Sequence, residues 1–153
     1  MRENDVECLR IARELAKVSS DPLTGVGCVI ANNGMIAKGV NRMPFRTLDS
    51  YERWNDRISK LTFVVHAEMD ALINASKSGV STDGAVVYIV CTDHSSVYGS
   101  PPCTQCTKHL IHAGVSGIVT LPRRADSKWA ADADLSLALL REAAVDYREV
   151  AFP

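Results

Sequence analysis

The sequence predicts an α/β protein, an α/β/α sandwich built around a mixed sheet of five strands. The first observation is a hairpin, because residues 26–31 and 35–40 are apolar runs separated by the turn sequence Asn32-Asn33-Gly34. The second is that strand-like apolar runs then alternate with segments of helical periodicity. A strand–helix–strand connection places its two strands parallel to each other. Helices that cover the sheet complete the sandwich.

The remaining elements follow from local patterns on either side of the hairpin. Before it, apolar residues at helical spacing predict a first helix that is capped by Asn4 or Asp5 and ends at about Val18. After it, residues 41–62 are mostly polar and are expected to hold a short helix around residues 51–61. The later elements are expected in the order helix 66–78, strand 85–91, a helix from about 103 to before 114, strand 117–121, helix 130–144 and strand 145–150.

Composition and charge limit the class of protein. The 153 residues are expected to form a single domain, residues 1–153, and 46% apolar with 23% charged residues is typical of a soluble globular protein. A formal net charge of −1 argues against binding of long nucleic acid. No secretory signal or membrane-length apolar run is apparent, so we expect no membrane association and a cytoplasmic location. Cys8, Cys28 and Cys91 lie in apolar patterns and are expected to be buried free thiols, which fits a reducing compartment.

Two short motifs carry the chemistry of the chain. They are His66-Ala67-Glu68 and, after a gap, Pro102-Cys103-Thr104-Gln105-Cys106. His66, Cys103 and Cys106 offer one nitrogen and two sulfurs, which are ligands that Zn²⁺ prefers, and a catalytic zinc site has three protein ligands and keeps a position for water. Glu68 lies about 200° around a helix from His66, so we expect it beside the bound water and not among the ligands.

Both motifs are expected at helix starts. Cys103 and Cys106 are spaced i, i+3 in a first helical turn, so their sulfurs can converge. The N-terminus of a helix favours thiolate over thiol and lowers the thiol pKa, which suits a metal ligand.

The pair H-x-E and P-C-x-x-C is the signature of zinc-dependent nucleobase deaminases. On these motifs the chain resembles the deoxycytidylate (dCMP) deaminase branch of the cytidine deaminase superfamily, and a cytidine deaminase-like fold is implied. Three departures concern the substrate and not the zinc. Arg42 stands where the branch usually has glycine, Asp70 where it usually has asparagine, and extra residues separate Thr92 from Pro102. The further segments that carry the resemblance are residues 20–22 leading into 26–30, residues 39–44, residues 66–71 and residues 140–150.

The resemblance implies an enzyme, a zinc-dependent hydrolase that deaminates dCMP to dUMP and ammonia. A zinc-activated water would attack the base, and Glu68 would shuttle the protons. An alternative on the same zinc core is a deaminase of a cytosine nucleoside or free nucleobase. A tRNA adenosine deaminase needs a basic RNA-binding surface, which the charge does not support. A non-catalytic zinc-binding module would leave Glu68 unexplained.

Contacts to the substrate are expected from several residues. The resemblance implies that Asn41 bonds the sugar, although an asparagine that only holds its own turn explains the sequence equally well. The backbone of Ala67 and the carbonyls of Ser100 and Pro101 would contact the base edge.

The extra residues before Pro102 leave two readings open. His94 and Tyr98 either reach over the site to the sugar or phosphate, or belong to an ordinary surface loop. A phosphate contact is expected from one arginine of the polar stretch. The same stretch can also pack against a second subunit, since we expect a homo-oligomer, a dimer or a hexamer. The candidate arginines are Arg42, Arg46, Arg53 and Arg57.

Overall fold

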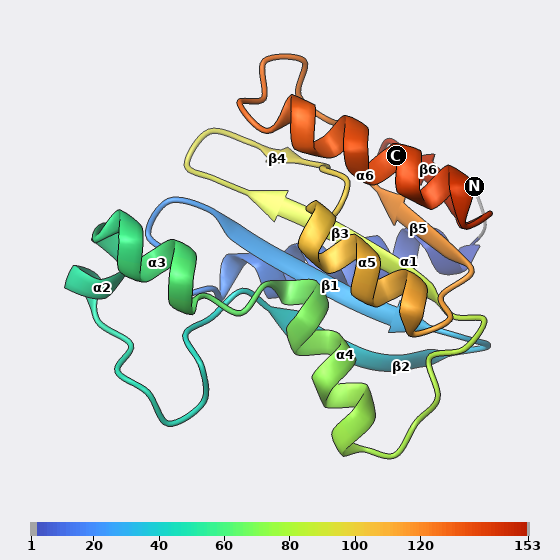
Figure 1. Cartoon of the computed structure of the whole chain (residues 1–153), viewed down its shortest axis with the longest axis horizontal. Helices are drawn as coiled ribbons and strands as arrows, with labels where there is room; N and C mark the ends of the chain where they lie inside the picture. The colour runs from blue at the N-terminus through green and yellow to red at the C-terminus, as the bar shows by residue number, and fades with distance from the viewer. Residues whose placement is uncertain (1–2, 153) are drawn as a thin grey trace.

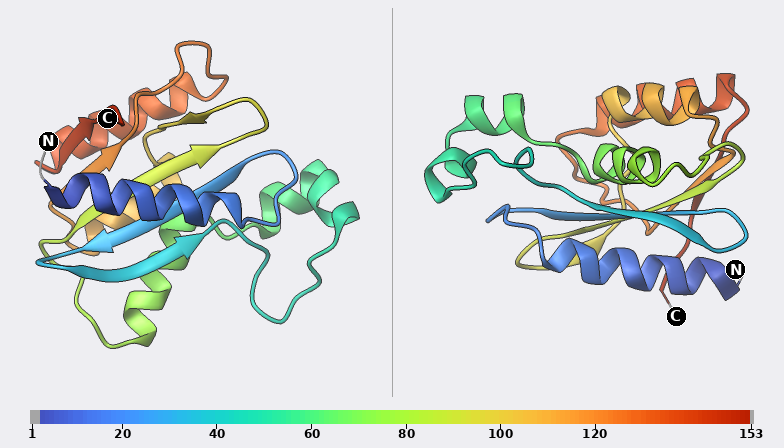
Figure 2. Two further views of the ribbon diagram at one scale, coloured as in Figure 1. Left: turned by 180° about the vertical axis from the view of Figure 1, so that it is seen from behind. Right: turned by 90° about the horizontal axis from the view of Figure 1, so that it is seen from below.

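The protein is an α/β/α sandwich in a computed structural model that describes residues 3–152. The N-terminal helix covers one face of the sheet, and helices that follow residue 66 cover the other (Figure 2). The mixed sheet has the strand order β2-β1-β3-β5-β6, with β4 paired to β3. The strands are β1 (Gly25–Ala31), β2 (Met35–Val40), β3 (Val86–Thr92), β4 (Val97–Tyr98), β5 (Gly117–Thr120) and β6 (Asp146–Glu149). The helices are α1 (Glu3–Lys17), α2 (Tyr51–Asn55), α3 (Arg57–Phe63), α4 (Ala67–Lys77), α5 (Thr104–His112) and α6 (Ala130–Glu142).

The sheet confirms the predicted architecture and adds one strand. The β1–β2 hairpin and the β1–β3 pair are antiparallel, whereas β3, β5 and β6 are parallel to one another. The added strand, β4, pairs Tyr98 with Cys91 and Val97 with Thr92 at the end of β3. The prediction of five strands missed it because two residues are too short to show an alternating pattern.

The start of α1 differs from the prediction. Asp5 lies inside the helix and not at its cap, and it is fully buried. Its carboxylate accepts a hydrogen bond of 3.1 Å from the Tyr88 hydroxyl. It also forms an ion pair with Arg148, in which Nη1 lies 3.1 Å from the carboxylate. The prediction that Asp5 caps the helix was wrong because its partners, Tyr88 and Arg148, lie on β3 and β6, which are distant in sequence.

The polar stretch forms two helices where one was predicted. Asp56 lies between them and caps both. Its backbone N–H donates to Glu52 O at the end of α2. Its carboxylate accepts a hydrogen bond of 2.7 Å from Ser59 N at the start of α3. Together α2 and α3 extend beyond one end of the sheet (Figure 1).

Apolar side chains fill both faces of the sheet. Cys28, Ile30, Ile89 and Ile118 point toward α4, α5 and α6, and Val29 and Val90 toward α1. All five cysteines are free, and Cys8, Cys28 and Cys91 are buried, as predicted. Within residues 3–152, no helix is long and apolar enough to span a membrane.

A glycine lets α4 lie directly on β2. A Cβ atom added at Gly39 would be 2.1 Å from Ala67 O and 2.4 Å from Ala71 N. Both atoms belong to the α4 backbone, which cannot move aside as a flexible side chain would. The position of the first turn of α4 relative to the sheet therefore depends on the absence of a side chain at residue 39.

Candidate active site and metal centre

The three predicted ligands meet where α4 and α5 begin. His66 is the N-cap of α4 and Cys103 the N-cap of α5. His66 Nδ1 lies 3.5 Å from Cys103 Sγ and 3.4 Å from Cys106 Sγ. The Cys103 sulfur also accepts the Cys106 N–H at 3.4 Å, so it caps its own helix. The three side chains run from exposed at His66, through half-buried at Cys103, to buried at Cys106.

The spacing of these atoms fits a zinc ion. Zn–N bonds of about 2.0–2.1 Å and Zn–S bonds of about 2.3 Å at a tetrahedral angle place nitrogen and sulfur roughly 3.6 Å apart. The two observed separations, 3.5 Å and 3.4 Å, are close to that value. The set leaves a fourth tetrahedral direction to a non-protein ligand, as in catalytic sites.

The charges of the cluster favour metal ligation. The pKa of Cys103 is lowered to about 4, because the Cys106 thiol and the His66 imidazole both hydrogen-bond to its sulfur. The pKa of Cys106 is raised, because its proton is shared with the Cys103 thiolate and its sulfur is buried. The pKa of His66 is raised to about 8, chiefly by its bond to Cys103. A divalent cation would replace the shared protons and stabilise both thiolates.

Glu68 lies in the first turn of α4, beside the cluster. Only 5% of the residue is exposed, and burial raises the pKa of its carboxyl group. His66 and Cys103 are among the charged groups that act on it. The sequence placed Glu68 off the ligand face of the helix, and the cluster of candidate ligands does not include it.

Two contacts fix the start of α4 next to the hairpin. Arg42 and Val65 exchange backbone hydrogen bonds of 3.0 and 2.8 Å, just before His66. The Asp70 carboxylate accepts the Val40 N–H at 3.0 Å and lies 4.0 Å from Arg42 Nε. The two departures from the usual family residues, Arg42 and Asp70, are therefore neighbours in the structure.

The side chain of Asn41 holds its own loop through both its oxygen and its nitrogen. Its side-chain oxygen accepts the Val26 N–H at 2.8 Å, and its side-chain nitrogen donates to Thr24 O at 2.9 Å. These bonds are the ones expected of an asparagine that holds its own turn. A contact to the sugar remains a prediction.

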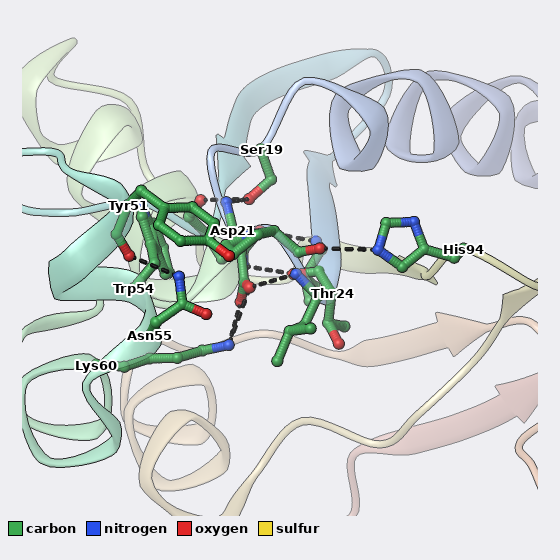
Figure 3. A network of polar contacts seen from close by, with 12 residues as sticks. Ser19, Asp21, Thr24, Tyr51, Trp54, Asn55, Lys60 and His94 are labelled. Carbon is green, nitrogen blue, oxygen red and sulfur yellow. Dashed lines mark hydrogen bonds and ion pairs between the residues drawn. The ribbon is translucent and has the colours of Figure 1, made fainter.

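The loop that precedes β1 is tied from two sides (Figure 3). Lys60 of α3 forms an ion pair of 2.7 Å with Asp21, whose side chain is 3% exposed. On the other side, His94 Nε2 lies 3.0 Å from the Pro22 carbonyl oxygen. Sequence reasoning missed the Lys60–Asp21 pair, since its residues are 39 positions apart in the chain and no motif links them.

All but one of the remaining predicted contacts lie between β3 and α5. Arg124 stacks on the Tyr98 ring at 3.8 Å and pairs with Asp93 at 2.6 Å, so the loop is anchored to the segment after β5. Ser100 is half-buried and its hydroxyl donates to Pro101 O at 3.0 Å. Ala67 is fully buried at the start of α4. Their roles toward a substrate remain predictions.

A cavity of about 280 Å³ lies where the loop before β1 meets the stretch after β2. Two of the four candidate arginines, Arg42 and Arg46, line it together with Asn41. Arg53, in contrast, donates to Leu48 O at 2.9 Å within its own segment. None of the metal-centre residues His66, Cys103 and Cys106 is among the residues that line this cavity, and the arginine that contacts a phosphate remains a prediction.

A three-ligand metal centre beside a buried glutamate, on an α/β/α sandwich, defines a class of zinc-dependent deaminases. Residues 2–121 match the family model described as the cytidine and deoxycytidylate deaminase zinc-binding region, and the chain belongs to this family.

Several curated relatives lie within the same family. The chain is 31% identical over 150 residues to a probable deoxycytidylate deaminase of Caenorhabditis elegans, covering 95% of this chain and 68% of the relative. It is 30% identical over 111 residues to the deoxycytidylate deaminase of Homo sapiens, covering 68% of this chain and 56% of the relative. The chain therefore spans between half and about two thirds of the length of these relatives.

Solved structures share the fold. The dCMP deaminase of the cyanophage S-TIM5, in complex with dCMP and dUMP, superimposes with a TM-score of 0.69 at 22% identity, covering 98% of this chain and 99% of the phage chain. A cytidine deaminase from Burkholderia pseudomallei gives a TM-score of 0.55 at 18% identity, covering 83% and 88%. These likenesses confirm the predicted cytidine deaminase-like fold.

Proposed function

We propose that this protein is a zinc-dependent hydrolase that converts dCMP and water to dUMP and ammonia. The observation that carries the proposal is the convergence of His66 Nδ1 with the two cysteine sulfurs, within 3.5 Å, beside the buried carboxyl group of Glu68. Three ligands and a proton carrier are the minimum that hydrolytic deamination of a base requires.

His66, Cys103 and Cys106 would hold the ion. Zinc, when bound, lowers the pKa of water toward about 7 and so supplies a nucleophile at neutral pH. Glu68 takes the proton that the attacking water gives up and passes it to ring N3, which makes C4 electrophilic. After oxygen has bonded to C4, the same carboxyl group moves the remaining proton of that hydroxyl to the amino group, the C4–N bond breaks, and ammonia leaves while C4 keeps a carbonyl oxygen.

Substrate orientation is assigned to the loops around this centre. The backbone of Ala67 and the carbonyls of Ser100 and Pro101 would bond the base edge, and Asn41 the sugar. His94 and Tyr98, on the loop after β3, are proposed to approach the sugar or phosphate.

The 5′-phosphate separates dCMP from a nucleoside. Arg42 and Arg46 border the cavity next to Asn41, and we assign the phosphate contact to this pair. A charge-assisted contact contributes about 1.5–3 kcal/mol, which is roughly ten- to a hundredfold in affinity. We also propose that the active form is a homo-oligomer, a dimer or a hexamer.

The deciding experiment is ammonia release from cytosine, cytidine, deoxycytidine, CMP, dCMP and dCTP under identical conditions. The expected result is a kcat/KM for dCMP that exceeds the value for deoxycytidine by at least about tenfold. Equal values for the two would leave the zinc chemistry intact and replace the nucleotide by a nucleoside or free base. Zinc retention without any turnover would favour a non-catalytic zinc-binding module.

A further inference from the structure

Helix α6 packs against α5 on the side away from α4 (Figure 1). It follows the region that the family model matches, which ends at residue 121, and it begins at residue 130. Two of its polar side chains, Asp132 and Ser136, contact the backbone around Cys103. Neither is explained by the reaction, and Ser136 is fully buried.

Asp132 caps α5 from outside the helix. Its two carboxylate oxygens accept hydrogen bonds from Thr104 N at 3.1 Å and from Thr104 Oγ1 at 2.8 Å. Thr104 directly follows Cys103 and is the first residue of α5. Asp132 is also in the first turn of α6, so the positive ends of two helix dipoles stabilise its negative charge.

Ser136 fixes the carbonyl that precedes the first cysteine. Its hydroxyl donates to Pro102 O at 2.7 Å. The hydroxyl of Thr107, on α5, lies 2.5 Å from Ser136 Oγ and 3.2 Å from the same carbonyl. Both residues are fully buried, so their hydroxyl groups are linked to each other and to Pro102 without competition from bulk solvent.

We propose that Asp132 and Ser136 are positioning residues for the zinc ligands Cys103 and Cys106. They hold the backbone on both sides of Cys103, at Pro102 and Thr104, and so fix the first turn of α5 where both sulfurs meet His66 Nδ1. The inference rests on the proposed function for the identity of the ion. It extends the metal centre to a helix that contributes no ligand.

The test is zinc affinity, measured by competition with a chromophoric chelator on the full chain. Outer partners of metal ligands typically contribute about 10–100-fold in affinity, and we expect losses of this size in Asp132→Ala and Ser136→Ala. The matched controls are Asp134→Ala, an aspartate on α6 whose side chain is 77% exposed, and Ser76→Ala, an exposed serine on α4. Each control should stay within about twofold of the unmodified chain.

A second readout separates positioning from a general loss of stability. A purely structural role lowers the melting temperature of the zinc-free and zinc-loaded protein equally. A positioning role also reduces the increase in melting temperature that added zinc produces, because weaker binding gives less stabilisation. Thr104→Val removes one of the two bonds to Asp132, so its effect should not add to that of Asp132→Ala.

The outcomes are distinct from those of the proposed function. If the unmodified chain binds no zinc, the proposed function fails. If it binds zinc and the folded Asp132 and Ser136 variants bind it within about threefold as tightly, this inference alone is overturned. Should Asp132→Ala not fold, Thr104→Val, which removes the bond from Thr104 Oγ1 to Asp132, decides the matter by the same criterion.

Discussion

The metal centre and the segment of residues 45–63 border the same loops, but they are built in opposite ways. At the centre, Glu68 is 5% exposed, Cys106 is 2% exposed, and the elements that carry them lie on the sheet. In the segment, Phe45 and Ile58 are each 78% exposed. The Lys60–Asp21 pair ties it to the rest of the molecule at one edge (Figure 3).

This difference in burial determines which region can hold reacting groups in a fixed geometry and which can tolerate substitutions. Buried side chains that pack on a sheet hold reacting groups in one geometry, which suits chemistry that tolerates little displacement. An exposed segment that carries large apolar side chains and arginines can instead change without disturbing the core. We therefore expect the reaction to depend on the geometry of the metal centre, and a contact with a neighbouring subunit to involve residues 45–63.

The largest expected effect is loss of the metal. Cys106→Ala removes a ligand from the buried side of the cluster, and we expect loss of bound zinc and of all measurable deamination. Circular dichroism should stay close to that of the unmodified chain, since the core does not include the ion. Elemental analysis of both proteins is the measurement. Stoichiometric zinc in an active variant would contradict the ligand assignment.

The second effect is confined to proton transfer. Glu68→Gln keeps the size of the side chain and cannot carry a proton, so kcat should fall about 10²–10⁴-fold while zinc content stays unchanged. Steady-state kinetics and zinc analysis on the same preparation separate the two. Turnover above about a tenth of the original rate would remove Glu68 from the mechanism.

A smaller effect is expected where the two regions are joined. Lys60→Ala leaves the nearly buried Asp21 carboxylate without its cation and should lower the free energy of unfolding by about 1–3 kcal/mol. Zinc affinity should not change, because the pair lies outside the cluster. Chemical denaturation with and without zinc measures both. The control is Lys38→Ala, an exposed lysine on β2.

The smallest effect on stability is expected on the exposed face. Ile58→Glu should change the free energy of unfolding by less than about 0.5 kcal/mol, since the side chain is exposed within one chain. If residues 45–63 pack against a second subunit, the same change should shift the mass measured by light scattering toward that of a single chain. An unchanged oligomer would place the subunit interface elsewhere.

The sequence predicted the metal centre better than its surroundings. The ligand residues are local in two motifs, so their types and spacing sufficed to predict that His66, Cys103 and Cys106 converge. The choice of Nδ1 as the imidazole atom that faces the sulfurs follows from the cap geometry of α4, which the pattern does not specify. Asp132 and Ser136 resemble ordinary helix residues in the sequence, and only the packing of α6 on α5 brings them to Cys103.

The Gly39 contact with α4 has a practical consequence for attempts to alter this protein. A random library that changes substrate preference can include residues 45–63 and 94–98 apart from the buried Trp54 and the ion-paired Lys60, because the other side chains are mostly exposed. Position 39 belongs outside such a library. Even alanine there would place an atom 2.1 Å from the Ala67 carbonyl oxygen and would have to push away the turn that bears His66 and Glu68. Variants at this residue would then be scored as inactive because the reacting groups had moved, and not because a substrate had been refused.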